Sequence, residues 1–368
     1  MKRVAEVVFI FFCAIFVLLF GVAIFAKPQR YFSEQENRRL SVFPRVSVSS
    51  VLNGKFSQSL GDFFTDQFPL RAKFTDLKAR SELLAGRGEN NGVVFGSDGY
   101  TVIKPEYDSL ELYRKNLSYI EDFCAEYNEK GIETTVFFAP RGIDVLTRYI
   151  ARPAGDRVWE IAESESLDII NANAELCEAV WRGEYVWNKT DHHFTALGAY
   201  ISYLKLCGEL GIEPIKKEDL KREILSEEFF GTVYSRAGLE DAESDELFIY
   251  RWSGDGEIKV INGKSISGLY CLKKLEQKDK YEVFLGGNYG HISICGEGEE
   301  RPTVMVIKDS FANSVMPYLA RDIDMEVYDL RYFSGSITDE IERVRPDRIV
   351  IFCGIDTVAT DGSFRKLF

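Results

Sequence analysis

The first 26 residues differ in pattern from the rest of the chain. An uncharged apolar run extends from Val7 to Ala26, and about 20 such residues span a bilayer as a helix. The run is longer than that of a cleaved signal peptide, and residues 23–26 form a poor cleavage site. We therefore expect a transmembrane signal anchor over residues 7–26. The positive charges before it predict a cytoplasmic tail, 1–6, with the bulk of the chain extracellular.

The pattern changes again between residues 27 and 90. Residues 27–60 are polar and irregular, whereas residues 52–90 place apolar side chains three and four positions apart, as an amphipathic helix does. Residues 92–103 contain Asp98-Gly99, a dipeptide typical of a hairpin turn. We expect a stalk and a helical segment over 27–90, followed by the main domain, 91–368.

The main domain alternates helical and strand patterns. Residues 110–130 have a helical period that ends before Gly131, and residues 133–139 form an apolar strand. Further strands and helices are expected at 302–309, 311–322, 325–330, 337–344 and 348–354. The strand runs are almost continuously apolar, as in parallel strands covered on both faces. The sequence therefore predicts a three-layer α/β/α domain with a mainly parallel sheet, and a β-rich insertion at about 213–300.

Charge and composition exclude some classes of function. The chain has 45 Lys and Arg against 58 Asp and Glu, a formal net charge of -13, which argues against a nucleic-acid partner. Seven cysteines occur without a C-x-x-C pair, so a zinc site of that type is not expected. Only His192, His193 and His291 are available for metal binding or for histidine chemistry.

Two short segments carry residue types suited to catalysis. Asp191-His192-His193 precedes a helix for which Thr195 is a suitable N-cap, and an Asp can hold a nearby imidazole in one tautomer. Ser310 follows the strand expected at 302–309, where a serine is exposed above the sheet. Together Ser310, His193 and Asp191 form a candidate catalytic triad.

The neighbours of these residues receive other interpretations. Asp309 is expected to brace the Ser310 turn, and Asn313 either contributes to an oxyanion hole or caps a helix. His291 and Tyr281 are expected to be structural residues of the β-rich insertion.

The Asp-His-His triplet also matches the signature of two-metal phosphoesterases. Such sites need several more Asp and His ligands, and only one other histidine exists in the chain. The triplet also precedes a capped helix, whereas the metal signature would end an apolar strand. We therefore expect neither a metal nor a cofactor.

Beyond these residues, the chain resembles the DHHW family of exported bacterial proteins. That family is similar to the catalytic domains of alginate O-acetyltransferases and to SGNH hydrolases. The matching stretches are ENRRLSVFP (36–44), DQFPLRAKF (66–74), GVVFGSDGY (92–100), TDHHFTALGAY (190–200), KDSFANSVMPYLA (308–320) and DLRYF (329–333). Their order and joint spacing make the resemblance specific.

The resemblance implies an SGNH-like domain and a role for each matching residue. Ser310 corresponds to the nucleophile, His193 to the base and Asp191 to the acid that orients it. The resemblance makes His192 either a structural or a substrate-contacting residue, and places Arg331 near the site; Asn313 and Phe194 are further candidates for oxyanion or substrate contacts. Two positions depart from the pattern: Phe194 replaces a tryptophan, which keeps an aromatic wall, and Lys308 replaces the glycine of G-D-S, which leaves the oxyanion hole unassigned.

The leading functional hypothesis is O-acetylation of a cell-surface or exported polysaccharide through an acyl-enzyme. The resemblance suggests a multi-pass membrane acyltransferase as the partner that supplies acetyl groups across the bilayer. An acetyl esterase would use the same triad with water as acceptor. A catalytically inactive polysaccharide-binding or assembly protein is the third hypothesis.

Overall fold

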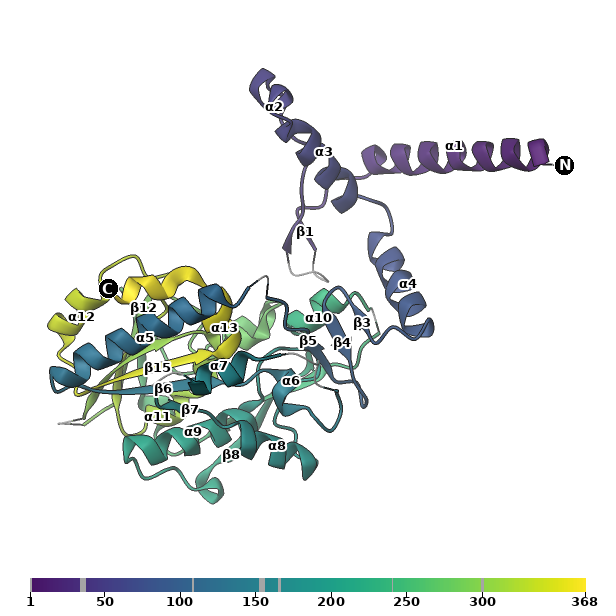
Figure 1. The fold of residues 1–368 in the computed structure, drawn as a ribbon. Coiled ribbons are helices and arrows are strands. Elements are labelled where there is room, and N and C mark those ends of the chain that lie inside the picture. The colour runs from purple at the N-terminus through teal and green to yellow at the C-terminus, as the bar shows by residue number, and fades with distance from the viewer. Residues whose placement is uncertain are drawn as a thin grey trace. The chain divides into compact units, whose positions relative to one another are not determined.

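The structure is a computed structural model that describes residues 2–33, 38–107, 109–151, 156–164, 167–239, 241–298 and 301–368. The chain divides into two units (Figure 1). One comprises Met1–Asn91 with Tyr234–Ala242, and the other comprises Gly92–Val233 with Glu243–Phe368.

The first unit contains the apolar N-terminal helix. Its elements are α1 (Lys2–Ala26), β1 (Phe32–Ser33), β2 (Arg38–Arg39), α2 (Val48–Leu52), α3 (Lys55–Asp66), α4 (Arg71–Leu84) and β3 (Glu89–Asn90). Within the described part of the chain, α1 is the one helix long and apolar enough to cross a membrane. The segment expected to be irregular over 27–60 includes α2, because Ser47 and Ser50 form a capping box at its start. Glu36 and Asn37, which begin the ENRRLSVFP stretch, lie outside the described residues.

The second unit is built on an eight-stranded sheet. Its order is β11-β10-β12-β14-β13-β15-β6-β7. The strands are β6 (Glu133–Ala139), β7 (Ile169–Ile170), β10 (Lys259–Asn262), β11 (Ser265–Ser267), β12 (His291–Cys295), β13 (Thr303–Lys308), β14 (Asp324–Tyr328) and β15 (Arg348–Gly354). From β14 to β7 all pairings are parallel, and from β14 to β11 they are antiparallel. The expected α/β class with a mainly parallel sheet is confirmed.

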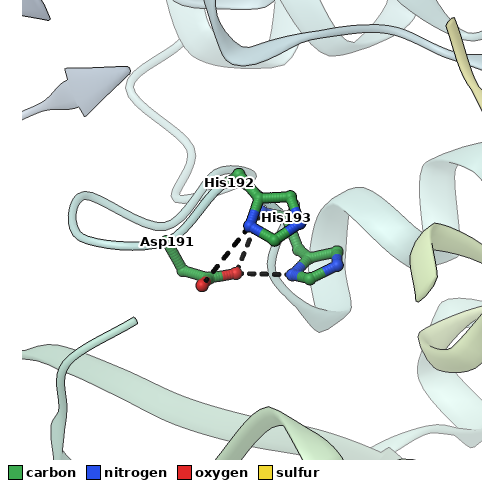
Figure 2. Close-up of side chains that lie close together, drawn as sticks. All are labelled: Asp191, His192 and His193. Atoms are coloured by element: carbon green, nitrogen blue, oxygen red, sulfur yellow. Dashed lines mark hydrogen bonds and ion pairs between the residues drawn. The ribbon is translucent and has the colours of Figure 1, made fainter. Parts of the chain in front are cut away.

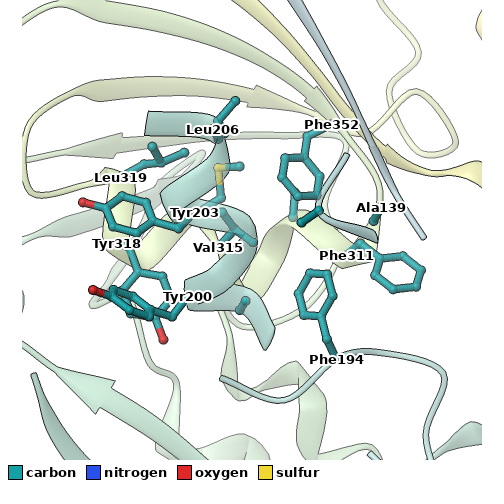
Figure 3. Close-up of a cluster of buried hydrophobic side chains, with 14 of the residues drawn as sticks. Ala139, Phe194, Tyr200, Tyr203, Leu206, Phe311, Val315, Tyr318, Leu319 and Phe352 are labelled. Carbon is teal, nitrogen blue, oxygen red and sulfur yellow. The ribbon is translucent and has the colours of Figure 1, made fainter. Parts of the chain in front are cut away.

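Helices cover both faces of this sheet (Figure 1). One face packs on α5 (Glu111–Glu129), α7 (Val158–Ser164), α12 (Ile337–Val344) and α13 (Ile355–Thr360). The other packs on α6 (Gly142–Val145), α8 (Asn173–Trp181), α9 (Ala196–Leu210) and α11 (Met316–Leu319). Figure 3 shows part of the hydrophobic cluster between the sheet and the helices of this second face. Tyr203 and Tyr318 lie in one group of side chains there, and Phe194 and Phe311 lie in another.

Alternation along β15 explains why its run is continuously apolar. Ile349 and Ile351 belong to the cluster under α5, whereas Val350 and Phe352 belong to the cluster under α9. All four side chains are buried because successive side chains of a strand point to opposite faces.

The helix expected over 311–322 is divided into two short pieces. The 3-10 helix η5 (Ser310–Ser314) is followed by α11, and Pro317 lies near the start of α11. Proline has no N–H to bond back into the preceding turn and its ring crowds that turn, which disfavours one continuous helix here.

The β-rich segment 213–300 takes part in two sheets. Strands β8 (Lys221–Phe229) and β9 (Asp245–Arg251) form an antiparallel pair, while β10, β11 and β12 extend the main sheet. His291 begins β12 and pairs in register with Tyr328 of β14. Among the described residues, the remaining strands are β4 (Val93–Phe95) and β5 (Thr101–Ile103), which form a hairpin, and the remaining α-helix is α10 (Thr232–Ala237).

Candidate active site

A pocket of about 190 Å³ opens at the carboxyl-terminal edge of the parallel strands. Its wall includes residues that follow four of them: Arg141 after β6, Ser310 after β13, Arg331 after β14 and Asp356 after β15. In open α/β sheets, ligands bind at this edge because the connecting loops converge there.

The turn that carries Ser310 is braced by the side chain of Asp309. One carboxylate oxygen accepts from the Phe311 N–H at 2.9 Å. The other accepts from the Gly354 N–H at 2.8 Å and from the Thr357 hydroxyl at 2.5 Å. A Cβ at Gly354 would lie 2.8 Å from the Phe311 ring, so glycine permits this close approach. Asp309 thus ties the end of β13 to the end of β15, and the bracing expected for it is observed.

The loop that carries Asp191 is held by buried polar groups. The Asp245 carboxylate accepts from the N–H groups of Lys189 and Thr190 at 2.7 and 2.8 Å. The side chain of Asn188 donates to the His193 carbonyl at 3.0 Å. Thr195 caps α9 by accepting from the Gly198 N–H, as its position predicts. These bonds fix the loop before the helix begins.

Asp191, His193 and Ser310 form one hydrogen-bonded chain. Asp191 Oδ1 lies 2.5 Å from His193 Nδ1, and His193 Nε2 lies 2.8 Å from Ser310 Oγ. Figure 2 shows the Asp191 carboxylate facing both imidazoles of the triplet. Burial alone raises the pKa of Asp191, but the adjacent His193 and His192 and the hydrogen bonds to the carboxylate outweigh it and hold that pKa well below its usual range. A buried carboxylate next to an imidazole favours the imidazolium during proton transfer.

His192 is oriented by a different partner. Its Nδ1 lies 2.6 Å from Thr232 Oγ1, and its side chain lines the pocket. Burial and the neighbouring His193 lower the pKa of His192 to about 4, so the ring is neutral near pH 7.

Several residues around the site were missed or interpreted differently from sequence. Tyr281, expected only to pack within the insertion, stacks on His193 with ring centroids 3.8 Å apart and planes 5° from parallel. Its hydroxyl lies 3.0 Å from Ser314 Oγ. The Thr232 N–H donates to Asp191 Oδ2 at 2.9 Å, and Gly231 leaves room for the Asp191 side chain, because a Cβ there would lie 2.2 Å from it. No local pattern distinguishes these residues, since they come from segments 40 or more positions away in the chain.

Arg141 also lines the pocket, and it could have been noticed because it follows a buried strand. Its guanidinium forms two bonds of 2.7 Å to Asp144 and one of 2.5 Å to Asp156. It also donates to the Tyr107 hydroxyl at 2.9 Å. These bonds keep a buried cation fixed in the pocket wall.

The remaining candidates are distributed around the pocket. Arg331 lines it and forms a two-pronged ion pair with Asp329. Phe194 is buried against Phe311 and Asn313 is buried beside Lys308, and neither is among the pocket-lining residues that the structure describes. His291 bonds Glu326 and stacks on Tyr328, away from the triad, as expected for a structural histidine.

Lys308, which stands where the resemblance implies the glycine of a G-D-S motif, is a buried cation. Its Nζ donates to Asn288 Oδ1 at 2.8 Å and to Asn313 Oδ1 at 2.7 Å, and it lies 3.7 Å from Asp329. Burial lowers the pKa of Lys308 to about 8, against the attraction of Asp329.

The triplet also brings three metal-type ligand groups within 4.8 Å of one another. In the described part of the chain this is the one such cluster of three or more His, Cys, Asp or Glu residues. Asp191 already accepts hydrogen bonds from His193 and Thr232 on its two oxygens. This donor set is engaged in positioning the imidazoles, and among the described residues it is not joined by the further carboxylates that a two-metal centre requires.

Comparison with known proteins gives the resemblance a firmer basis. The family model described as DHHW protein matches residues 173–343, which include the triplet and Ser310. The resemblance to the DHHW family is thereby confirmed. The chain is 24% identical over 175 residues to the probable alginate O-acetylase AlgJ of Pseudomonas putida. This match covers 44% of the chain and 45% of AlgJ, less than half the length of that relative.

Two solved structures are similar in fold. A DHHW family protein from Eubacterium siraeum is 20% identical, with a TM-score of 0.61 over 76% of this chain and 95% of that one. Bacillus cereus PatB1 with a sulfonyl adduct is 16% identical, with a TM-score of 0.61 over 74% of this chain and 99% of that one. At these identities the likeness establishes a shared fold.

Proposed function

We propose that this chain is a membrane-anchored, extracellular O-acetyltransferase with an SGNH-like domain, which acts on a cell-surface or exported polysaccharide. The observation that carries the proposal is the chain of short contacts from Asp191 through His193 to Ser310 at the pocket. The likeness to a probable alginate O-acetylase supports acetyl transfer as the reaction and a polysaccharide as the acceptor class.

In the first half-reaction, Ser310 Oγ bonds to the acetyl carbonyl carbon and its proton passes to His193 Nε2. The ionised Asp191 stabilises the resulting imidazolium. The bond to the donor oxygen then breaks, and that oxygen leaves with the proton from His193. An acetyl ester on Ser310 remains.

In the second half-reaction, an acceptor hydroxyl attacks the acetyl carbonyl and gives its proton to His193 Nε2. Ser310 Oγ leaves and recovers that proton, which returns the enzyme to its starting state. Arg331 is suited to assist in both halves, because it lines the pocket while Asp329 holds its Nε and Nη2. A fixed cation at this position would stabilise negative charge on the carbonyl oxygen.

The setting of the site is consistent with transfer at a membrane surface. Helix α1 would anchor the chain with its catalytic unit outside the cytoplasm, where acetyl-CoA is absent. A multi-pass membrane acyltransferase that delivers acetyl groups across the bilayer would supply the acetyl donor. We propose such a protein as the partner.

The test uses the full chain in detergent with p-nitrophenyl acetate and with a sulfonyl fluoride. We expect one acetyl group on Ser310 by peptide mass spectrometry, and sulfonylation of the same residue. Ser310→Ala should abolish both adducts, and His193→Ala should slow acylation by about 10³-fold or more.

Acceptors then separate transfer from hydrolysis. Acetyl appearing on an added oligosaccharide supports the transferase, whereas release only as acetate would identify an esterase. A folded chain that forms neither adduct would contradict an enzymatic function and favour a binding or assembly role.

A further inference from the structure

The protonation state of His192 follows from the groups around its Nδ1. Thr232 Oγ1 lies 2.6 Å from this nitrogen and 3.2 Å from Asp191 Oδ2. The Asp191 carboxylate is ionised and can only accept, so the single hydroxyl proton of Thr232 points to it. His192 Nδ1 must then donate to Thr232. The proton of this neutral imidazole is therefore on Nδ1, and Nε2 carries a lone pair.

This lone pair has no partner among the residues that the structure describes. His192 Nε2 makes no hydrogen bond there, although the side chain remains 34% exposed and lines the pocket beside Ser310. In contrast, Asp191 and His193 are almost fully buried, at 2% and 4% exposure. The triplet thus presents two imidazoles in different states: His193 faces Ser310, and His192 offers a hydrogen-bond acceptor to the pocket.

We propose that His192 is a positioning residue for the acceptor: its Nε2 accepts a hydrogen bond from a hydroxyl group of the acceptor and aligns that group for attack on acetylated Ser310. The ligand class is a polyhydroxylated molecule, whose hydroxyls can donate to one group while another reacts. This inference rests on the proposed function, because it assigns His192 to the second half-reaction.

The division of labour between the rings is set by their contacts. The rings lie 3.8 Å apart, centroid to centroid, so one sugar residue can reach both. The reacting hydroxyl loses its proton to His193 Nε2, and the neighbouring hydroxyl keeps its proton while it donates to His192. With a pKa near 4, His192 is a poor base but remains an acceptor throughout the working pH range.

The chemistry predicts which step depends on His192. Acylation by p-nitrophenyl acetate releases a leaving group that needs neither protonation nor a hydrogen bond, so this step should not depend on the His192 lone pair. Deacylation to glycerol requires a hydroxyl to be aligned and should depend on it. Acetyl-enzyme should therefore accumulate when the acceptor nitrogen is removed.

Two substitutions separate positioning from a structural role. His192→Asn keeps an N–H near the place of Nδ1, and so the bond to Thr232, but has no atom at Nε2. His192→Gln reaches the position of Nε2 with an amide oxygen but cannot reproduce the Nδ1 donor. Positioning predicts that the Gln variant is the better catalyst of deacylation, whereas a purely structural role predicts the reverse.

The experiment follows the full chain in detergent after a pulse of p-nitrophenyl acetate, with molar glycerol as the probe acceptor. We expect acylation within threefold of wild type in both variants. We expect glycerolysis to fall by about tenfold in His192→Asn, the effect of one lost hydrogen bond, and by less in His192→Gln.

The outcomes separate this inference from the function on which it rests. Failure of the wild-type chain to form acetyl-Ser310 overturns the proposed function. Normal acylation with no glycerolysis by wild type contradicts both acyl transfer to a hydroxyl and the role of His192. Normal wild-type acylation and glycerolysis, with unchanged glycerolysis in His192→Asn or with a larger loss in His192→Gln, overturns the role of His192 alone. Parallel loss of acylation and glycerolysis in both variants also overturns it, because the ring would then act on the fold.

Discussion

Gly231 is the residue at which a single methyl group should disable the site. It is buried, and its N–H donates to Thr190 Oγ1 at 3.1 Å. A Cβ at this position would lie 2.2 Å from both Cβ and Oδ2 of Asp191, whereas ordinary contact begins at 3.4 Å. Gly231→Ala must therefore displace the Asp191 carboxylate by about 1.2 Å, the difference between these two distances.

A displacement of that size would break the alignment of the triad. Asp191 Oδ1 lies 2.5 Å from His193 Nδ1, so a shift of this length exceeds what the hydrogen bond can tolerate. Misplacing a reacting group by about 1 Å costs roughly 10²-fold in rate. We expect the acylation rate constant to fall by about that factor. The free energy of unfolding should fall by about 1–3 kcal/mol, the usual effect of overpacking a buried site.

Stopped-flow acylation with p-nitrophenyl acetate and urea unfolding measure the two effects separately. Gly268→Ala is the matched control, because no atom lies within 4 Å of a Cβ at that exposed position. We expect the control to keep wild-type acylation and stability. Acylation by folded Gly231→Ala within threefold of wild type would refute the reasoning, since the position of Asp191 would then not matter.

Two further predictions concern buried charge. Lys308→Met should lower the free energy of unfolding by about 1–3 kcal/mol, because Asn313 Oδ1 and its neighbours lose a buried donor. An unchanged free energy of unfolding, measured by chemical denaturation, would contradict this. The lowered pKa of His192 means that the unfolded chain binds more protons between pH 4 and 6.5, so wild-type stability should fall as pH decreases through that window. Urea unfolding at several pH values should show that the free energy of unfolding depends less steeply on pH in His192→Asn than in wild type. An equal pH dependence in the two proteins would exclude His192 as the source of the effect.

Local pattern was sufficient for many of the elements. The helix expected over 110–130 is α5, and the strand expected over 133–139 is β6 with the same bounds. These elements are set by neighbours in the chain: apolar spacing for the helix, and a continuous apolar run for a strand buried on both faces. The segment 311–322 departs from its expected form because Pro317 interrupts the backbone ladder.

Local sequence pattern could not predict which distant segments of the chain pair with one another. Short β-type runs over 213–300 predict strands but not their partners, and β10 and β12 join the edge of the main sheet through antiparallel contacts. Tyr281 has the sequence context of an ordinary packing residue. Only the chain path around it brings its ring onto His193.

The sequence by itself determined the apolar N-terminal helix, the α/β class and the chemical types at the site, because each depends on residue identity and on spacing of a few positions. Asp191 and His193 are two residues apart, so their pairing is local. His193 and Ser310 are 117 positions apart in the chain. The sheet brings them together, because it sets β13 beside β15 and the loop before α9 lies at the carboxyl ends of these strands. Only the tertiary structure decided the 2.8 Å contact between those two residues, the space that Gly231 leaves for the Asp191 side chain, and the placement of the His192 ring in the pocket wall with Nδ1 on Thr232. Each feature depends on contacts between segments that are far apart in the chain, and no local sequence pattern predicts which distant segments meet.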